Sequence, residues 1–348
     1  MKLGKRIIIW SILPLSIELM GLLYVDKIYL RRNGNYKIEK VVEKEEKKID
    51  NLEIPMDENI NKIQLSHDGK YVSYIKNGNI EIINTLNGEK TSVESSLGEL
   101  NYYTWLPDRA RMYIFEKHIK ENGQSYMKLY SYDKDKNHKE EVLDNHYNKI
   151  NIPLANSKYN IQDIVMSTLT GVSYVKVETN NERSNIYRLN IMSQTEKYKG
   201  YLKIGNINIL NRDDTMIYED LRYGKIRVAD KQNSISIPDT KRLCLLGVDN
   251  QDVIYLGSIN EEEKIESIYY DNIDDEDKKW NRINIDNPCK SEDIKILKSG
   301  KVYINDKAKS AIIGVSLGKE IKYKGKIVAY YDKGFGVLYN GKFTKIKY

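Results

Sequence analysis

Short apolar runs separated by turn residues follow one another along most of the chain. In the clearest unit such runs lie at residues 63–65, 71–75 and 80–83, and the dipeptides Asp68-Gly69 and Asn77-Gly78 separate them. Because Gly, Asn and Asp tolerate the backbone conformations of tight turns, the unit predicts three successive antiparallel strands. Strand units that recur at a fixed period are typical of a β-propeller.

The turn followed by an apolar strand recurs seven times. Most successive turns are separated by about 40 to 50 residues, the length of a four-stranded blade. The exceptions are the 62 residues between the second and third turns and the 25 between the last two. We predict an all-β fold in which residues 52–348 form one propeller of seven blades, with six as the alternative. The segments that carry the repeat are 68–74, 108–114, 170–175, 213–218, 250–255, 299–304 and 324–330.

The two ends of this region are predicted to meet. Residues Leu52-Glu53-Ile54 can add an outer strand to the blade that ends at Phe343-Thr344-Lys345-Ile346. Such a closure removes the free strand edges of an open arrangement.

Two of the turns resemble a known repeat. Ser66-His67-Asp68-Gly69-Lys70 is similar to the Ser-Pro-Asp-Gly-Lys motif of TolB-type β-propellers, and Trp105-Leu106-Pro107-Asp108-Arg109 resembles the related Trp-Ser-Pro-Asp-Gly form. His67 replaces a proline and Arg109 replaces a glycine. The resemblance covers residues 60–145 and fades beyond them. The family includes soluble partner-binding propellers and regulatory propellers of some peptidases, so the resemblance implies a fold and says little about activity.

The N-terminal residues 1–32 predict a membrane anchor. Residues 7–25 form an apolar run that spans about 28 Å as a helix, close to the thickness of a bilayer core. Lys2, Lys5 and Arg6 precede it. No small-x-small cleavage site or lipobox cysteine follows, so we predict an uncleaved signal-anchor.

The positive-inside rule places the N-terminus in the cytoplasm and the propeller outside, although Lys27, Arg31 and Arg32 compete at the other end. Glu18 lies inside the span, either in contact with another membrane helix or tolerated in a single anchor. The mixed charges of residues 33–51 predict a solvated linker.

The charge of the chain argues against a nucleic-acid partner. The formal net charge is +6, of which residues 1–32 carry +4, so the rest of the chain carries only +2. A nearly neutral domain has no basic surface for a phosphate backbone.

Motifs for catalysis or cofactor binding are weak. Gly314-Val315-Ser316-Leu317-Gly318 matches a nucleophile elbow, but a strand-like segment follows it and no histidine lies downstream. Asp133-Lys134-Asp135-Lys136-Asn137 begins like a calcium loop, but His138 and Asp144 occupy key positions, so we interpret it as a polar hairpin. We assign no catalytic, cofactor-binding or metal-binding residue. The four histidines, which lack metal-ligand spacing, are His67, His118, His138 and His146.

Two further groups leave alternatives open. Cys244 and Cys289 are either an extracytoplasmic disulfide or two separate thiols, and the second is our default. Tyr102-Tyr103-Thr104-Trp105 is either a carbohydrate-stacking platform or, by default, part of the core.

Our leading hypothesis is a membrane-anchored, extracytoplasmic propeller that binds a protein or wall-polymer partner without catalysing a reaction. The first alternative is a hydrolase of cell-wall polysaccharide, which needs two carboxylates about 5–9.5 Å apart. The second is a scaffold that faces the cytoplasm. The carboxylates available to the hydrolase are the repeated turn residues Asp68, Asp108, Asp213 and Asp252.

Overall fold

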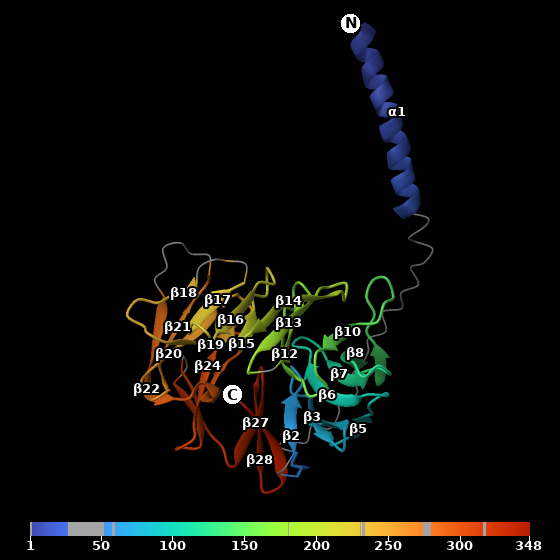
Figure 1. The fold of residues 1–348 in the computed structure, drawn as a ribbon. Coiled ribbons are helices and arrows are strands. Elements are labelled where there is room, and N and C mark those ends of the chain that lie inside the picture. Colours follow the sequence, from blue (N-terminus) through green and yellow to red (C-terminus); the bar gives the residue numbers. More distant parts are fainter. Residues whose placement is uncertain are drawn as a thin grey trace. The chain divides into compact units, whose positions relative to one another are not determined.

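The computed structural model describes residues 2–26, 52–57, 60–179, 181–229, 231, 234–273, 280–315 and 318–348. The chain divides into two units, Met1–Glu46 with helix α1 (Lys2–Tyr24) and Lys47–Tyr348 with every strand (Figure 1). Over the described residues, no helix combines the length and the apolar character needed to cross a membrane. The anchor over residues 7–25 stays a prediction, and the linker over 33–51 lies outside the described residues.

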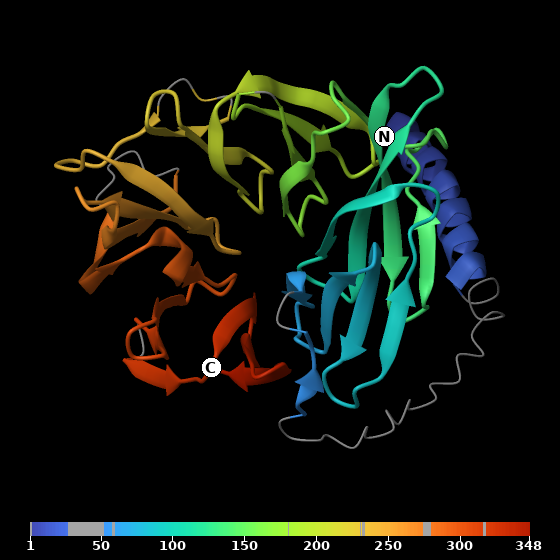
Figure 2. The ribbon, with the colours of Figure 1, turned by 60° about the horizontal axis from the view of Figure 1, so that its bottom comes forward.

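Residues 52–348 form seven antiparallel sheets around a central axis (Figure 2). The seven-blade prediction is confirmed, and the six-blade alternative is wrong. In blades 1 to 3 the innermost strand comes first. Their strands are β2 (Asn61–Leu65), β3 (Tyr71–Lys76), β4 (Asn79–Asn84) and β5 (Lys90–Val93); β6 (Glu99–Trp105), β7 (Arg111–Ile119), β8 (Ser125–Asp133), β9 (His138–Glu141) and β10 (Asn151–Leu154); and β11 (Ile161–Met166), β12 (Ser173–Glu178), β13 (Ser184–Leu189) and β14 (Thr195–Leu202).

Blades 4 to 6 follow the same order, and blade 7 takes its outer strand, β1, from the start of the unit. Their strands are β15 (Ile204–Ile209), β16 (Met216–Asp220), β17 (Lys225–Val228) and β18 (Ser234–Ile235); β19 (Leu243–Val248), β20 (Ile254–Ile259), β21 (Ile265–Asp271) and β22 (Asn281–Cys289); β23 (Ile294–Ile296), β24 (Val302–Asp306), β25 (Ala311–Gly314) and β26 (Lys319–Lys322); and β27 (Lys326–Tyr331), β28 (Gly334–Tyr339), β29 (Lys342–Lys347) and β1 (Ile54–Pro55).

The core lies between the blades. Each of seven hydrophobic clusters gathers buried side chains from two neighbouring blades, including blades 7 and 1. A middle strand therefore needs apolar side chains on both faces, which explains continuous apolar runs such as that of β20. The turns between strands supply the polar residues and the glycines with positive φ, such as Gly69 at 69°.

Strand β1 closes the ring, as the sequence predicts. Ile54 pairs with Phe343 and Pro55 with Lys342, so a strand from the start of the unit completes the sheet formed by its end. Phe343 is fully buried against the cluster shared by blades 7 and 1. The ring of Phe343 occupies the space that a side chain at position 336 would need, because a Cβ atom added to Gly336 would lie only 2.3 Å from it.

Two spacings of the repeat have structural explanations. In blade 2 the outer edge is shared by β9 and β10, which pair with different halves of β8, and the excursion between them lengthens the blade. The seventh predicted turn, at Lys324-Gly325, is wrong. Residues 326–331 form the innermost strand β27, so the equivalent turn is Asp332-Lys333 before β28. This shift explains the apparent spacing of 25 residues.

The closure makes a testable prediction about stability. Phe343→Ala should lower the free energy of unfolding by about 3–5 kcal/mol, because a large buried ring leaves a cavity. Lys342→Ala is the matched control, since its ion pair with Glu53 at 2.6 Å is exposed and contributes at most about 1 kcal/mol. Urea titration of both variants measures the difference. Equal losses would mean that the β1–β29 junction does not hold the ring.

Candidate functional site: the central channel

The seven innermost strands, β2, β6, β11, β15, β19, β23 and β27, surround the central axis (Figure 2). Six of them carry a register shift against their neighbouring strand, and only β23 among the described inner strands lacks one. Such bulges add a residue and redirect a side chain. The chain around these shifts is rich in polar residues, which are Lys62, Asn101, Gln162, Asp163 and Asn206.

Several of these polar side chains join one inner strand to the next. Gln64 Nε2 donates to the carbonyl of Tyr103 at 2.8 Å, which links blades 1 and 2. Asn101 Oδ1 accepts from the amide of Ile161 at 2.9 Å, which links blades 2 and 3. Asn206 Nδ2 donates to the carbonyl of Leu245 at 3.2 Å, which links blades 4 and 5. These three side-chain amides therefore join neighbouring blades of the ring.

Charged side chains also line the channel. Asp163 of β11 and Lys295 of β23 belong to blades 3 and 6, and each influences the ionisation of the other across the channel. Burial raises the pKa of Asp163 despite the nearby cations Lys176 and Lys295. Lys295 is exposed to the channel, yet the protein that surrounds it lowers its pKa despite Asp332 and Asp163. Both shifts have the sign that desolvation of a charge produces.

One end of the channel opens into a pocket of about 180 Å³, which we call the mouth pocket. It is lined by the ends of β2, β6, β23 and β27 and by the turns that follow them. The turns after β2, β6 and β23 belong to repeated segments that the sequence identifies, and the turn after β27 is the one that it missed. Its polar and aromatic lining comprises Ser66, His67, Trp105, Lys295, Lys298, Tyr330, Tyr331 and Asp332.

The charges of the mouth pocket are incompletely neutralised. Burial lowers the pKa of Lys298, and the second cation Lys295 lowers it further. Burial raises the pKa of Asp332, although His67 and both lysines oppose this shift. Two acidic side chains outside the lining, Asp249 and Asp252, also favour the charged form of Lys298. Their oxygens accept backbone amide hydrogens of the turns, Asp249 from Gln251 and Val253 and Asp252 from Asn211 and Arg212.

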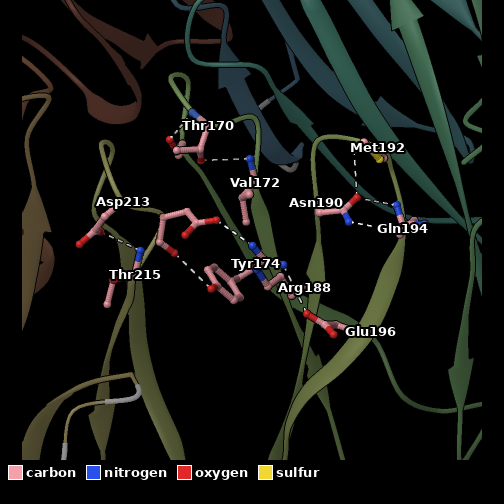
Figure 3. A network of polar contacts seen from close by, with 12 residues as sticks. Thr170, Val172, Tyr174, Arg188, Asn190, Met192, Gln194, Glu196, Asp213 and Thr215 are labelled. Atoms are coloured by element: carbon pink, nitrogen blue, oxygen red, sulfur yellow. Dashed lines mark hydrogen bonds and ion pairs between the residues drawn. The ribbon is translucent and has the colours of Figure 1, made fainter. Parts of the chain in front are cut away.

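Three of the turn carboxylates that the hydrolase alternative needs are committed to their own turns. Asp68 Oδ1 accepts from Ser66 Oγ at 2.7 Å and from the amide of Lys70 at 2.9 Å. Asp108 forms an ion pair with its neighbour Arg109. Asp213 Oδ1 accepts from the amide of Thr215 at 3.0 Å (Figure 3). They stabilise turns in separate blades, which counts against a shared catalytic pair.

The residue next to Asp213 belongs to a network between blades 3 and 4. Asp214 accepts from Arg188 Nη2 at 2.8 Å, and its carbonyl accepts from Tyr174 Oη at 3.1 Å. Arg188 also pairs with Glu196 at 3.4 Å (Figure 3). Neighbouring turn aspartates therefore have different roles. Asp213 accepts a hydrogen bond within its own turn, whereas Asp214 joins blades 3 and 4.

Asp252 instead joins blade 5 to blade 4. Its two carboxylate oxygens accept from the amides of Asn211 and Arg212, the latter at 3.2 Å. Those amides belong to the turn after β15, so the side chain bridges two repeats that are separated in the sequence.

The remaining sequence candidates fall outside the channel. Ser316 and Leu317 lie outside the described residues, but Lys319–Lys322 is strand β26, as predicted. Asp133 accepts from the amides of Asp135 and Lys136 in the turn between β8 and β9, which confirms the polar hairpin. In the described parts of the chain, no three acidic, histidine or cysteine side chains group as metal ligands.

The cysteines and aromatic residues follow their default interpretations. Cys244 and Cys289 are free and lie on β19 and β22, three strand spacings apart in blade 5, which is too far for a disulfide. Tyr103 and Trp105 are buried, and Trp105 Nε1 donates to Ser73 Oγ at 2.8 Å. Trp105 nevertheless borders the mouth pocket with part of its side chain or backbone.

Sequence reasoning missed the charges that distinguish the channel. Lys295 is a single charge within Ile294-Lys295-Ile296-Leu297, and Asp163 precedes Ile164-Val165-Met166. A lone charge in an otherwise apolar inner strand was the available signal. Such a charge can be interpreted only once the strand is known to line a channel.

The comparisons with known proteins support the fold. No protein-family model and no curated protein matches the chain. Among solved structures, an oligogalacturonate lyase from Vibrio parahaemolyticus is similar, with a TM-score of 0.51, 11% identity and coverage of 84% of this chain and 90% of the other. A chain of the mitotic checkpoint complex has a TM-score of 0.51 at 9% identity, with coverage of 87% and 95%. Hsv2p from Kluyveromyces lactis has a TM-score of 0.50 at 13% identity, with coverage of 80% and 89%. At these identities the likeness shows a shared propeller fold alone.

The bridging role of Asp252 can be tested against Asp213. Asp252→Asn should lower the free energy of unfolding by about 1–3 kcal/mol, because one of the two bound amides would face a donor instead of an acceptor. Asp213→Asn should change it by less than about 0.5 kcal/mol, since Asn forms the same exposed turn contact. Chemical denaturation measures both. A neutral Asp252→Asn variant would show that the bridge between blades 4 and 5 contributes little.

Proposed function

We propose that this protein is a membrane-anchored, extracytoplasmic β-propeller that recognises a partner through its central channel and catalyses no reaction on it. The mouth pocket carries the proposal, because it is a concave site with several charged groups at the end of a rigid ring. Ligand sites commonly combine a preformed hollow with a few convergent polar groups. The turn carboxylates that a hydrolase would have used are instead engaged in turns and bridges.

The resemblance of residues 60–145 to TolB-type repeats supports a binding role, since that family includes partner-binding propellers. The apolar run at residues 7–25 and the basic residues before it support the anchor. A tethered propeller would meet a membrane-bound partner at a high effective concentration. Either a protein or a wall polymer could occupy the mouth.

The proposed orientation can be tested on the full chain with a C-terminal tag. We expect protease added to intact cells to remove the tag, because the propeller would lie outside the membrane. Removal only after permeabilisation would instead favour the scaffold that faces the cytoplasm. A tag on a known cytoplasmic protein in the same cells is the control for leakage.

The proposed use of the mouth can be tested by site-specific photo-crosslinking. A photoreactive amino acid at position 332, on the mouth pocket, should give cross-linked products in intact cells. The same group at position 90, on the exposed start of the outer strand β5, is the matched control and should give none. Equal products at both positions, or none at position 332, would contradict recognition through the mouth.

A further inference from the structure

The mouth pocket lies where the inner strands of four blades end, and two basic side chains, Lys295 and Lys298, are part of its lining. Two polar atoms without a hydrogen-bond partner among the described residues, the Tyr331 hydroxyl and His67 Nδ1, are fully buried and do not face the hollow. The Tyr331 ring packs against Gly69 and Gly334 in the cluster between blades 7 and 1. The case for a ligand therefore rests on the cations of the lining.

The charge of the lining indicates the kind of ligand. Lys295 and Lys298 both line the pocket, and Lys295 lies close enough to disfavour the charged form of Lys298. Asp332 is the only carboxylate in that lining, and it is exposed at the rim. Lys298 Nζ reaches one acceptor, the carbonyl of Val248, at the long distance of 3.3 Å. The ammonium group therefore retains donors for a second acceptor.

The pocket also has an apolar wall of suitable size. Tyr330 lies on one side, with Lys295 Nζ 5.6 Å from the centre of its ring, and Pro107 is part of the lining. A volume of about 180 Å³ is smaller than the roughly 300–1,000 Å³ of typical small-molecule sites, so it suits one group of a larger ligand. A separate cavity of about 340 Å³ has the acidic residues Asp163 and Glu292 in its lining, so it does not suit an anion.

We propose that the mouth pocket binds an anionic group, either a carboxylate or a phosphate, on a larger polar ligand. Lys298 and Lys295 hold the anion by charge and by hydrogen bonds from their ammonium groups. The rest of the ligand would lie against Tyr330 and extend into the channel. This inference deepens the proposed function and rests on it, since it names the ligand chemistry of the same site.

The test uses the full chain purified in a non-ionic detergent. Glucuronate and glycerol 3-phosphate are the two anionic probes, and glucose and glycerol are their neutral counterparts. Isothermal titration calorimetry measures the binding of each compound to the protein. We expect at least one anion to bind in the millimolar range or tighter and neither neutral compound to bind. The preferred anion distinguishes a carboxylate from a phosphate ligand.

Four variants make the proposal falsifiable. Lys298→Ala should weaken binding of the preferred anion about tenfold or more, the loss expected for one charged hydrogen bond, and Lys298→Arg should restore part of it. Asp332→Asn should tighten binding, because it removes the competing carboxylate. Lys90→Ala, at an exposed lysine far along the blade, should leave binding unchanged, and melting temperatures confirm that each variant folds.

Two results would overturn the inference. One is the absence of binding by both anions, and the other is equal binding by the wild type, Lys298→Ala and Asp332→Asn. If cross-linking at position 332 nevertheless succeeds, the mouth recognises a partner through other chemistry, and the proposed function survives without the anion. If cross-linking fails while the anions bind as expected, the site is real but serves a soluble small ligand.

Discussion

The structure depends on the burial of both faces of every blade against its two neighbours. A small antiparallel sheet with two apolar faces is unstable alone in water, and the seven clusters between blades are where those faces are covered. Coverage of all seven sheets requires a closed ring. The ring is complete only because Ile54 and Met56, from the start of the unit, pack with Phe343 from its end.

The same closure produces the channel. The innermost strands of neighbouring blades pair with their own sheets rather than with each other, so side chains must satisfy the polar groups between them. Gln64, Asn101 and Asn206 meet this need by reaching the backbone of the next blade. Polar residues of an inner strand that form such bonds therefore have a structural role. Only the polar residues that do not form them are candidates for a functional role.

The repeat carried most of the information about the fold. Glycine and aspartate turns such as Asp68-Gly69 identify a blade because few residues accept their backbone conformation, and these turns predicted the seven-bladed ring. Its closure was predicted separately, from residues 52–54 as an outer strand beside the last blade. The turn at Asp332-Lys333 was missed because the preceding Lys324-Gly325 also places a glycine before an apolar strand, although that strand is the innermost strand β27. Local composition does not tell which strand of a blade a turn follows.

The site was much harder to predict. Lys295, Lys298 and Asp332 come from the neighbouring blades 6 and 7, and the closed ring adds His67 of blade 1 to the same hollow. The sequence instead drew attention to Asp68, Asp108, Asp213 and Asp252, because they recur. Their recurrence has a local cause, since an aspartate oxygen near a turn can accept its backbone amides. Repetition in a propeller therefore indicates what every blade needs to fold, and departures from it are a better guide to a site.

A rigid ring also explains why charges can persist in the channel. In a flexible chain, Lys295 and Lys298 would move toward carboxylates or out into water, because a desolvated charge is costly. Here β23 is held by the clusters on both faces of blade 6, and the acids near Lys298 outside the pocket, Asp249 and Asp252, are committed to backbone amides. The ring thus keeps two cations in a hollow with one carboxylate. Because the two cations are already held in place, an anion can bind without a rearrangement of the protein, and this preorganisation favours recognition.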